Sequence, residues 1–426
     1  MSDTPLDIED ILADLFPLNR SLTGPGNRST LEYLQKIVPE IKIRSVKSGT
    51  KIFDWVVPEE WVVNDAYVKN KHGKKIIDFQ KNNLHLMGYS TAFSGKLNKK
   101  ELLQHVYTLP RKPDWIPYRT SYYSKQWGFC CNHSLLNSPD FVGPFEVLVD
   151  TRHIRNGQLI FGEAYKKGLR DEEILISTYM CHPSLANDNL SGLVGAALLF
   201  RDLAKRETKF SYRLVIAPET IGTLAFLKSH KNHNKILGGT ILTTIAGPDP
   251  ISMKEAHKSE HWINRITHCV LSERFGDDYI TYPFKPNGSD ERQYSSPAFD
   301  IAMPSIHKSK YYEYEEYHTS QDNLNFITSK ALAETVDVYT SWISAVDSFC
   351  FPSRKNAEGE YFLSGRGLYP SVGGTINQPS HDTDAALDTN SGQTGIKITQ
   401  KHLDAFDWVM HMSNGKNSNI DIAERS

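Results

Sequence analysis

Strand and helix patterns alternate through the second half of the chain, and this alternation constrains the fold more than any other feature. From residue 145 onward, short apolar runs such as EILISTYM and YRLVIAPE are each followed by a helical stretch, SGLVGAALLFRDLAKR after the first and TIGTLAFLKSH after the second. Apolar strands that alternate with helices are typical of a sheet covered by helices on both faces. The sequence therefore predicts an α/β fold built on a mostly parallel, mixed sheet.

The other segments differ in hydrophobic pattern and composition, and these differences divide the chain into further regions. Residues 7–38 show two helical patterns joined by a Gly/Pro turn, and we assign them to the α/β domain, which then comprises 1–48 and 145–349. Residues 49–144 carry short β-type runs rich in Trp and Tyr, which predict a β-rich inserted domain. Residues 350–426 begin with a stretch dense in Gly, Ser, Asn and Asp and end in a helical pattern. They predict a loop-rich linker and a short α-helical appendage.

Composition and charge exclude several classes of protein. The net charge of −2 over 426 residues provides no basic field for nucleic acid or anionic membranes, so we expect neither partner. No apolar run approaches the ~20 residues that a membrane-spanning helix needs. The acidic N-terminus does not resemble a secretory signal, and the five cysteines form no CxxC pair. We expect a cytoplasmic protein with reduced thiols, acting on a peptide or small amide; a homo-oligomer remains open.

Several residues capable of metal chemistry follow predicted strands. The ligand site of an open α/β sheet lies at the carboxyl ends of its strands. The run ILISTYM is followed by His182 and, after a short turn, by Asp188, while RLVIA is followed by Glu219. The later segment YEEYHTSQDN places His318 in a polar turn. Two imidazoles and a carboxylate are a plausible ligand set for a catalytic zinc with one open position, and a nearby Glu supplies a base.

These segments resemble the co-catalytic zinc aminopeptidases and their relative glutaminyl cyclase. In that fold a His, an Asp-Asn-x-Ser-Gly motif, a Glu-Glu-x-Gly motif, a Ser-Asp segment and a Tyr-His-Thr segment follow in this order. The chain carries corresponding segments in the same order: His182, Asp188–Gly192, Glu219–Gly222, Ser289–Asp290 and Tyr317–Thr319. The shared fold covers about residues 1–45 and 145–348. The likeness extends over the full length to a little-characterised bacterial group of aminopeptidase-like proteins with a C-terminal winged-helix region.

The resemblance implies residue roles, and two departures from it change the expected metal content. The first Glu of the Glu-Glu-x-Gly motif is the general base and the second binds one zinc; this chain has Glu219 and then Thr220. The family's other ligand Asp falls near Thr243 or Thr244, neither of which can replace a carboxylate. The expected cofactor is therefore one zinc per chain with three ligands: His182, Asp188 and His318.

Further expectations concern the surroundings of the metal. Asp290 and Asp322 are candidates to orient the imidazoles, although Asp290 could instead form a salt bridge with the neighbouring Arg292. Cys181 is interpreted as a small buried hydrophobic residue rather than a nucleophile. The resemblance also implies a cis peptide bond after Asp188.

The first functional hypothesis is hydrolysis of a peptide or amide bond, with an N-terminal amino acid as the favoured substrate end. An amidase or deacylase acting on an amino sugar, or a cyclising acyl-transfer enzyme, would use the same activation of a water molecule or a carbonyl group by the metal. An alternative from another class is a catalytically inactive aminopeptidase-like binding module, because two of the fold's carboxylate ligands are missing. Retention of Glu219 favours an enzyme, since a general base has no use without an activated water.

Overall fold

The computed structural model describes residues 7–356, 358–366 and 399–426. It comprises two compact units, Met1–Ser344 and Ala345–Ser426. Most of the predicted Gly- and Ser-rich linker lies outside the described residues. Among the described residues, no helix has both the length and the apolar character that crossing a bilayer requires.

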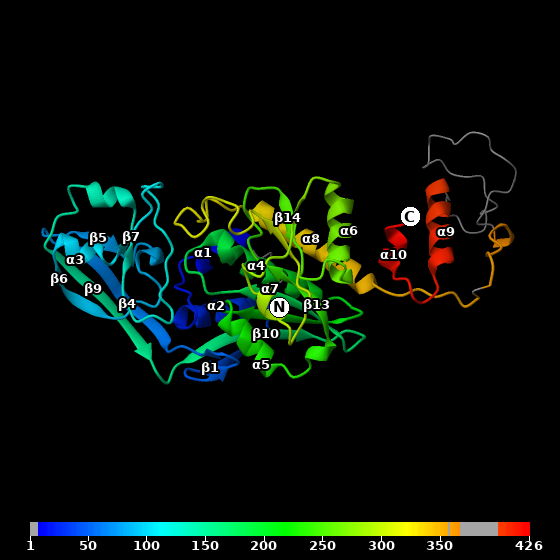
Figure 1. Cartoon of the computed structure of the whole chain (residues 1–426), viewed down its shortest axis with the longest axis horizontal. Coiled ribbons are helices and arrows are strands. Elements are labelled where there is room, and N and C mark those ends of the chain that lie inside the picture. Colours follow the sequence, from blue (N-terminus) through cyan, green and yellow to red (C-terminus); the bar gives the residue numbers. More distant parts are fainter. Residues whose placement is uncertain (1–6, 357, 367–398) are drawn as a thin grey trace. The chain divides into compact units, whose positions relative to one another are not determined.

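An eight-stranded mixed sheet forms the centre of the first unit (Figure 1). In spatial order its strands are β1 (Lys42–Lys47), β10 (Gln158–Lys166), β12 (Ser211–Ala217), β11 (Glu173–Tyr179), β13 (Ile236–Leu242), β16 (Ser305–Lys308), β14 (Ile251–Lys254) and β15 (Ile280–Tyr282). The strands from β12 to β16 are parallel, whereas β1, β10 and β14 each pair antiparallel with a neighbour. The predicted α/β class with a mixed sheet is confirmed, and its parallel part is the centre.

Helices cover both faces of this sheet. They are α1 (Ile8–Leu15), α2 (Pro25–Ile37), α4 (Gly192–Ala204), α5 (Ile221–Ser229), α6 (Trp262–Phe275), α7 (Glu291–Tyr294) and α8 (Ser329–Ser348). The helix α4 leads from β11 to β12, and α5 leads from β12 to β13 on the other side of β11. Because such crossovers are right-handed, α4 and α5 lie on opposite faces. Contacts of α1 and α2 with α4 place these two helices on the α4 face.

A separate four-stranded antiparallel sheet belongs to the β-rich segment (Figure 1). Its strands, in spatial order, are β5 (Lys75–Asp78), β4 (Glu60–Lys69), β9 (Phe145–Ile154) and β6 (Phe93–Leu97). Residues 145–154 are predicted from the sequence to lie in the α/β domain, but β9 forms its hydrogen bonds with β4 and β6. Its alternating buried residues Phe145, Val147 and Val149 belong to a half-buried antiparallel strand. By strand pairing, the β-rich segment therefore extends one strand beyond the predicted boundary at 144.

The second unit contains two helices, α9 (Gln400–Met412) and α10 (Asn419–Ala423). Each begins with a capping box, in which Thr399 and Ser418 bond the backbone of the first turn. A short α-helical appendage is thus present as predicted. Its likeness to the start of a winged-helix domain stays a prediction.

Candidate metal centre

The candidate site lies at the ends of three neighbouring strands, where the chain passes from β11 to β12 on one side and then returns to β13 on the other side of β11. Strand β12 flanks β11 on one side and β13 flanks it on the other, and all three are parallel. Their carboxyl ends therefore open at one edge of the sheet. His182 follows β11, Glu219 follows β12 and Thr243 follows β13. His318 arrives from the loop between β16 and α8.

The structure brings together the three residues predicted as metal ligands. One potential ligand atom from each of His182, Asp188 and His318 lies within 4.8 Å of the other two. Asp188 is fully buried, His182 is buried, and the side chain of His318 is 33% exposed. Two imidazoles and a carboxylate are a donor set that fits zinc.

Two buried atoms of this cluster lack hydrogen bonds. Asp188 Oδ2 and His318 Nε2 lie 2.9 Å apart, yet neither makes a hydrogen bond of acceptable geometry. His182 Nε2 lies 3.8 Å from the same oxygen. Buried polar atoms without partners are rare because each costs about 1–3 kcal/mol. A cation held between these three atoms would satisfy all of them, so the residues present fit a metal ion.

Only one oxygen of Asp188 is available to a metal. The other, Oδ1, accepts a 2.5 Å hydrogen bond from the Tyr179 hydroxyl, which also contacts Thr243 Oγ1 at 2.7 Å. The peptide bond between Asp188 and Asn189 is cis, as expected. Burial raises the pKa of Asp188, but the neighbouring His182 and His318 lower it by more. The resulting pKa is about 2. The carboxylate is therefore ionised throughout the neutral range.

Asp322 acts on the backbone of the Asp188 turn and does not orient an imidazole as predicted. Its Oδ1 accepts the backbone N–H of Asn187 at 2.6 Å, and its Oδ2 accepts that of Asp188 at 3.0 Å. The Tyr314 hydroxyl donates to Oδ2 at 2.9 Å. Burial raises the pKa of Asp322 to about 7, although the hydrogen bond from Asn187 opposes this shift. Asp322 thus fixes the turn that presents Asp188.

Asp290 likewise binds the turn after β12 and not an imidazole. It accepts the backbone N–H of Thr220 at 2.7 Å and the hydroxyl of Thr223 at 2.8 Å. The alternative salt bridge with Arg292 is not formed within 4.0 Å. Thr220 has a positive φ of 63°, a strained conformation for a β-branched residue, and the hydrogen bond that its N–H donates to Asp290 stabilises it. Asp290 therefore positions the segment that carries Glu219.

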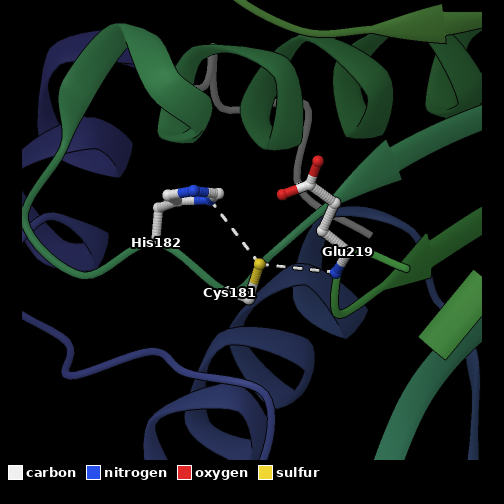
Figure 2. Close-up of side chains that lie close together, drawn as sticks. All are labelled: Cys181, His182 and Glu219. Atoms are coloured by element: carbon white, nitrogen blue, oxygen red, sulfur yellow. Dashed lines mark hydrogen bonds between the residues drawn. The ribbon is translucent and has the colours of Figure 1, made fainter. Parts of the chain in front are cut away.

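A second cluster shares His182 with the first (Figure 2). Potential ligand atoms of Cys181, His182 and Glu219 also lie within 4.8 Å of one another. The Cys181 thiol accepts the backbone N–H of Glu219 at 3.3 Å and lies 3.6 Å from His182 Nδ1, as the dashed lines show. Burial raises the pKa of Cys181 well above its usual value, so it remains a thiol. Because Cys181 is already engaged, the first cluster is the better metal site.

The charge of Glu219 depends on its surroundings. Burial raises its pKa well above the usual value, and Asp290 and Asp188 raise it further, whereas Arg292 lowers it. In the absence of a nearby cation, these effects favour the protonated form of Glu219. A divalent cation at Asp188 would oppose the repulsion between the carboxylates and favour ionised Glu219.

Aromatic rings that were not predicted from the sequence form a wall of the site. The Tyr118 ring, from the β-rich segment, lies 5.4 Å from the ring of His182 and 5.1 Å from that of His318. Its backbone N–H donates to the carbonyl oxygen of His318 at 2.8 Å. Tyr317 stacks on His318 at 3.9 Å. The aromatic density of WIPYRTSYY indicates a packed segment, but no local signal shows which ring reaches the metal ligands.

Comparisons with known proteins agree with this architecture. Residues 9–348 match a family model described as a domain of unknown function, DUF4910. A Clostridium acetobutylicum protein is 37% identical over all of this chain and 92% of its own length. It is provisionally named a polysaccharide biosynthesis protein with an aminopeptidase-like domain.

Solved structures extend the comparison to zinc enzymes. A provisionally named peptidase from Clostridium acetobutylicum superposes with a TM-score of 0.85 at 36% identity, over 98% of this chain and 90% of that one. A zinc aminopeptidase from Bacillus subtilis gives a TM-score of 0.55 at 10% identity, over 81% of this chain and 96% of that one. The second likeness shows the shared fold only.

The His182 imidazole should be neutral at physiological pH. Burial lowers its pKa to about 4, which the charge of Asp188 only partly offsets. The neutral, metal-binding form then persists from high pH down to about 4. The neutral imidazole contributes fully to the stability of the fold at pH values above about 6.5, the pKa of a histidine in the unfolded chain. This contribution is lost as the pH falls from about 6.5 to about 4. An NMR titration of the metal-free protein should give a His182 midpoint near 4, and a midpoint above 6 would contradict this assignment.

Replacement of Asp322 by asparagine should weaken metal binding. The amide NH₂ would face one of the backbone N–H groups of Asn187 and Asp188, so that donor loses its acceptor. We expect Asp322→Asn to lower zinc affinity by about 10- to 100-fold, as for other groups that support metal ligands. Competition with a chromophoric chelator measures the change. Asp337→Asn, at an exposed ion pair with Arg274, is the matched control and should bind zinc normally.

Proposed function

The chain belongs to the DUF4910 family, and we propose that it is a hydrolase of peptide or amide bonds that uses one zinc, with aminopeptidase activity as the first candidate. One observation carries the proposal. Asp188 Oδ2 and His318 Nε2 are buried without hydrogen bonds and converge 2.9 Å apart beside His182. The names of the relatives, peptidase and aminopeptidase-like protein, support the same class of chemistry.

The donors around Asp188 support one metal rather than two. Its Oδ1 is engaged by the Tyr179 hydroxyl, so a single carboxylate oxygen is left for coordination. Thr220 stands after Glu219 where the resembled enzymes have a carboxylate ligand, and their other ligand falls near Thr243 or Thr244, after β13. Hydroxyl groups that hydrogen-bond to Arg292 and Tyr179 are poor substitutes for carboxylates at a second zinc.

The chain's own residues supply the remaining catalytic requirements. When bound, zinc would provide Lewis-acid activation of a water molecule and of the scissile carbonyl. A carboxylate oxygen of Glu219, within 4.8 Å of a His182 nitrogen, would accept the water proton and return it to the leaving amine. Cys181 and Asp290 hold the backbone of this turn at Glu219 and Thr220. Such fixed placement limits the reorganisation that the reaction requires.

Deacylation of an amino sugar is a second candidate. The observation in its favour is the name of the Clostridium acetobutylicum relative, which refers to polysaccharide biosynthesis. The same metal ligands and base would cleave an N-acyl group from a sugar amine. Release of acetate from N-acetylated sugars, as opposed to amines from aminoacyl anilides, distinguishes the two candidates.

The proposal predicts about one zinc per chain. Replacing His182 or His318 by alanine removes one of three ligands and should abolish tight binding. Plasma mass spectrometry of the purified variants measures the metal content. His72→Ala changes an exposed histidine in the β4–β5 turn and should retain zinc. Two tightly bound ions per wild-type chain would rule out the single-zinc site.

Replacing Glu219 by glutamine should separate metal binding from catalysis. Glu219 is assigned as a base and not as a ligand, so Glu219→Gln should keep its zinc while turnover falls by ~10² or more. Turnover is measured on a panel of aminoacyl anilides and N-acetylated sugars. The matched control is Glu334→Gln, at a half-exposed position on α8. Loss of zinc from the Glu219 variant would make this residue a ligand instead.

A further inference from the structure

Arg292 is a cation beside the candidate site that has no acidic partner. It lies on α7, and its Nη2 donates to Thr220 Oγ1 at 3.2 Å. Its Nε is buried and makes no hydrogen bond. Within the described ranges, no Asp or Glu oxygen approaches its guanidinium to 4.0 Å. A guanidinium group with unused donors is suited to binding an anion.

The contacts of Arg292 place it next to the catalytic turn. Thr220, which it bonds, directly follows Glu219. Burial and Glu219 raise the pKa of Tyr312, whereas the charge of Arg292 lowers it. The 57% exposed Tyr312 ring lies 5.0 Å from that of Tyr317, which stacks on a metal ligand. Arg292 is therefore near both the base and the solvent-exposed aromatic rim of the site.

The other carboxylates near this turn are already engaged. Both oxygens of Asp290 accept hydrogen bonds from threonines. Glu291 Oε1 accepts from the Lys254 ammonium and, at 2.9 Å, from the Tyr311 hydroxyl. Asp322 accepts two backbone N–H groups and a tyrosine hydroxyl. A substrate carboxylate would meet Arg292, whose guanidinium has no acidic partner within 4.0 Å.

We propose that Arg292 is a specificity-determining residue that binds a carboxylate of the substrate, so that the substrate is an amide with a carboxylate near the scissile bond. This inference rests on the proposed hydrolase function and narrows its substrate class. Guanidinium and carboxylate groups match in geometry and form charge-assisted hydrogen bonds. An acidic side chain, a peptide C-terminus and a uronic acid all present this group.

Calorimetry on zinc-loaded Glu219→Gln protein tests the proposal, because this variant should bind ligands without cleaving them. Three ligand pairs distinguish the sources of the carboxylate: Ala-Ala against its C-terminal amide, Glu-Ala-amide against Gln-Ala-amide, and N-acetylglucosaminuronic acid against N-acetylglucosamine. In at least one pair the carboxylate ligand should bind about tenfold tighter or more, as expected for a charge-assisted hydrogen bond. Adding Arg292→Gln should abolish that preference, and Arg292→Lys should retain part of it.

Arg155→Gln provides the matched control in the same background. The Arg155 side chain is 88% exposed and lies in the turn between β9 and β10, so its loss should leave the preference unchanged. Circular dichroism verifies that each variant is folded. If Arg292→Gln weakens both members of every pair equally, Arg292 only holds Thr220, and the proposal is overturned. It is also overturned if the protein with Arg292 intact shows no carboxylate preference in any pair.

Metal analysis of the same samples separates this inference from the proposed function. The calorimetric comparison is repeated on metal-free protein, because the charge of Arg292 does not depend on zinc. A carboxylate preference that persists in a protein unable to bind zinc would support the Arg292 assignment and refute the zinc hydrolase. Zinc binding without any carboxylate preference would refute the Arg292 assignment and leave the zinc hydrolase supported.

Discussion

The buried carboxylate of Asp188 is the constraint on which the candidate site depends. Removing a charge from water is costly, and the group is retained only where donors and opposite charges compensate it. Tyr179 satisfies one oxygen, and the other faces His182 and His318. Backbone hydrogen bonds to Asp322 fix the turn that carries Asp188. A metal ion between the three side chains would complete this compensation, which explains why so many polar groups are buried here.

The scaffold brings these side chains together from the connections that follow β11, β12 and β16. The turns after β11 and β12 present His182 and Glu219, and Cys181 joins these turns through one thiol. The β-rich segment contributes as well, because Tyr118 bonds the backbone of His318 and packs against its ring. It is therefore part of the site's wall, and not merely an addition to the fold.

The likeness to a zinc aminopeptidase at 10% identity concerns the fold, while the chemistry depends on particular side chains. The same sheet can present different ligands at its strand ends without altering its packing. In this chain Thr220 and Arg292 bring a hydroxyl and a cation to the turn after β12. The hydrogen bond between these two residues lies outside the ligand cluster at Asp188.

The sequence by itself determined the α/β class, the helices that flank the sheet and the ligand candidates at strand ends. These follow from hydrophobic periodicity and turn residues, which are local properties. Only the tertiary structure decided that β9 joins the smaller sheet, that Asp290 and Asp322 bind backbone N–H groups rather than imidazoles, and that Tyr118 reaches the metal ligands. Such contacts join residues far apart in the chain, and packing selects them among many partners that the local pattern allows equally.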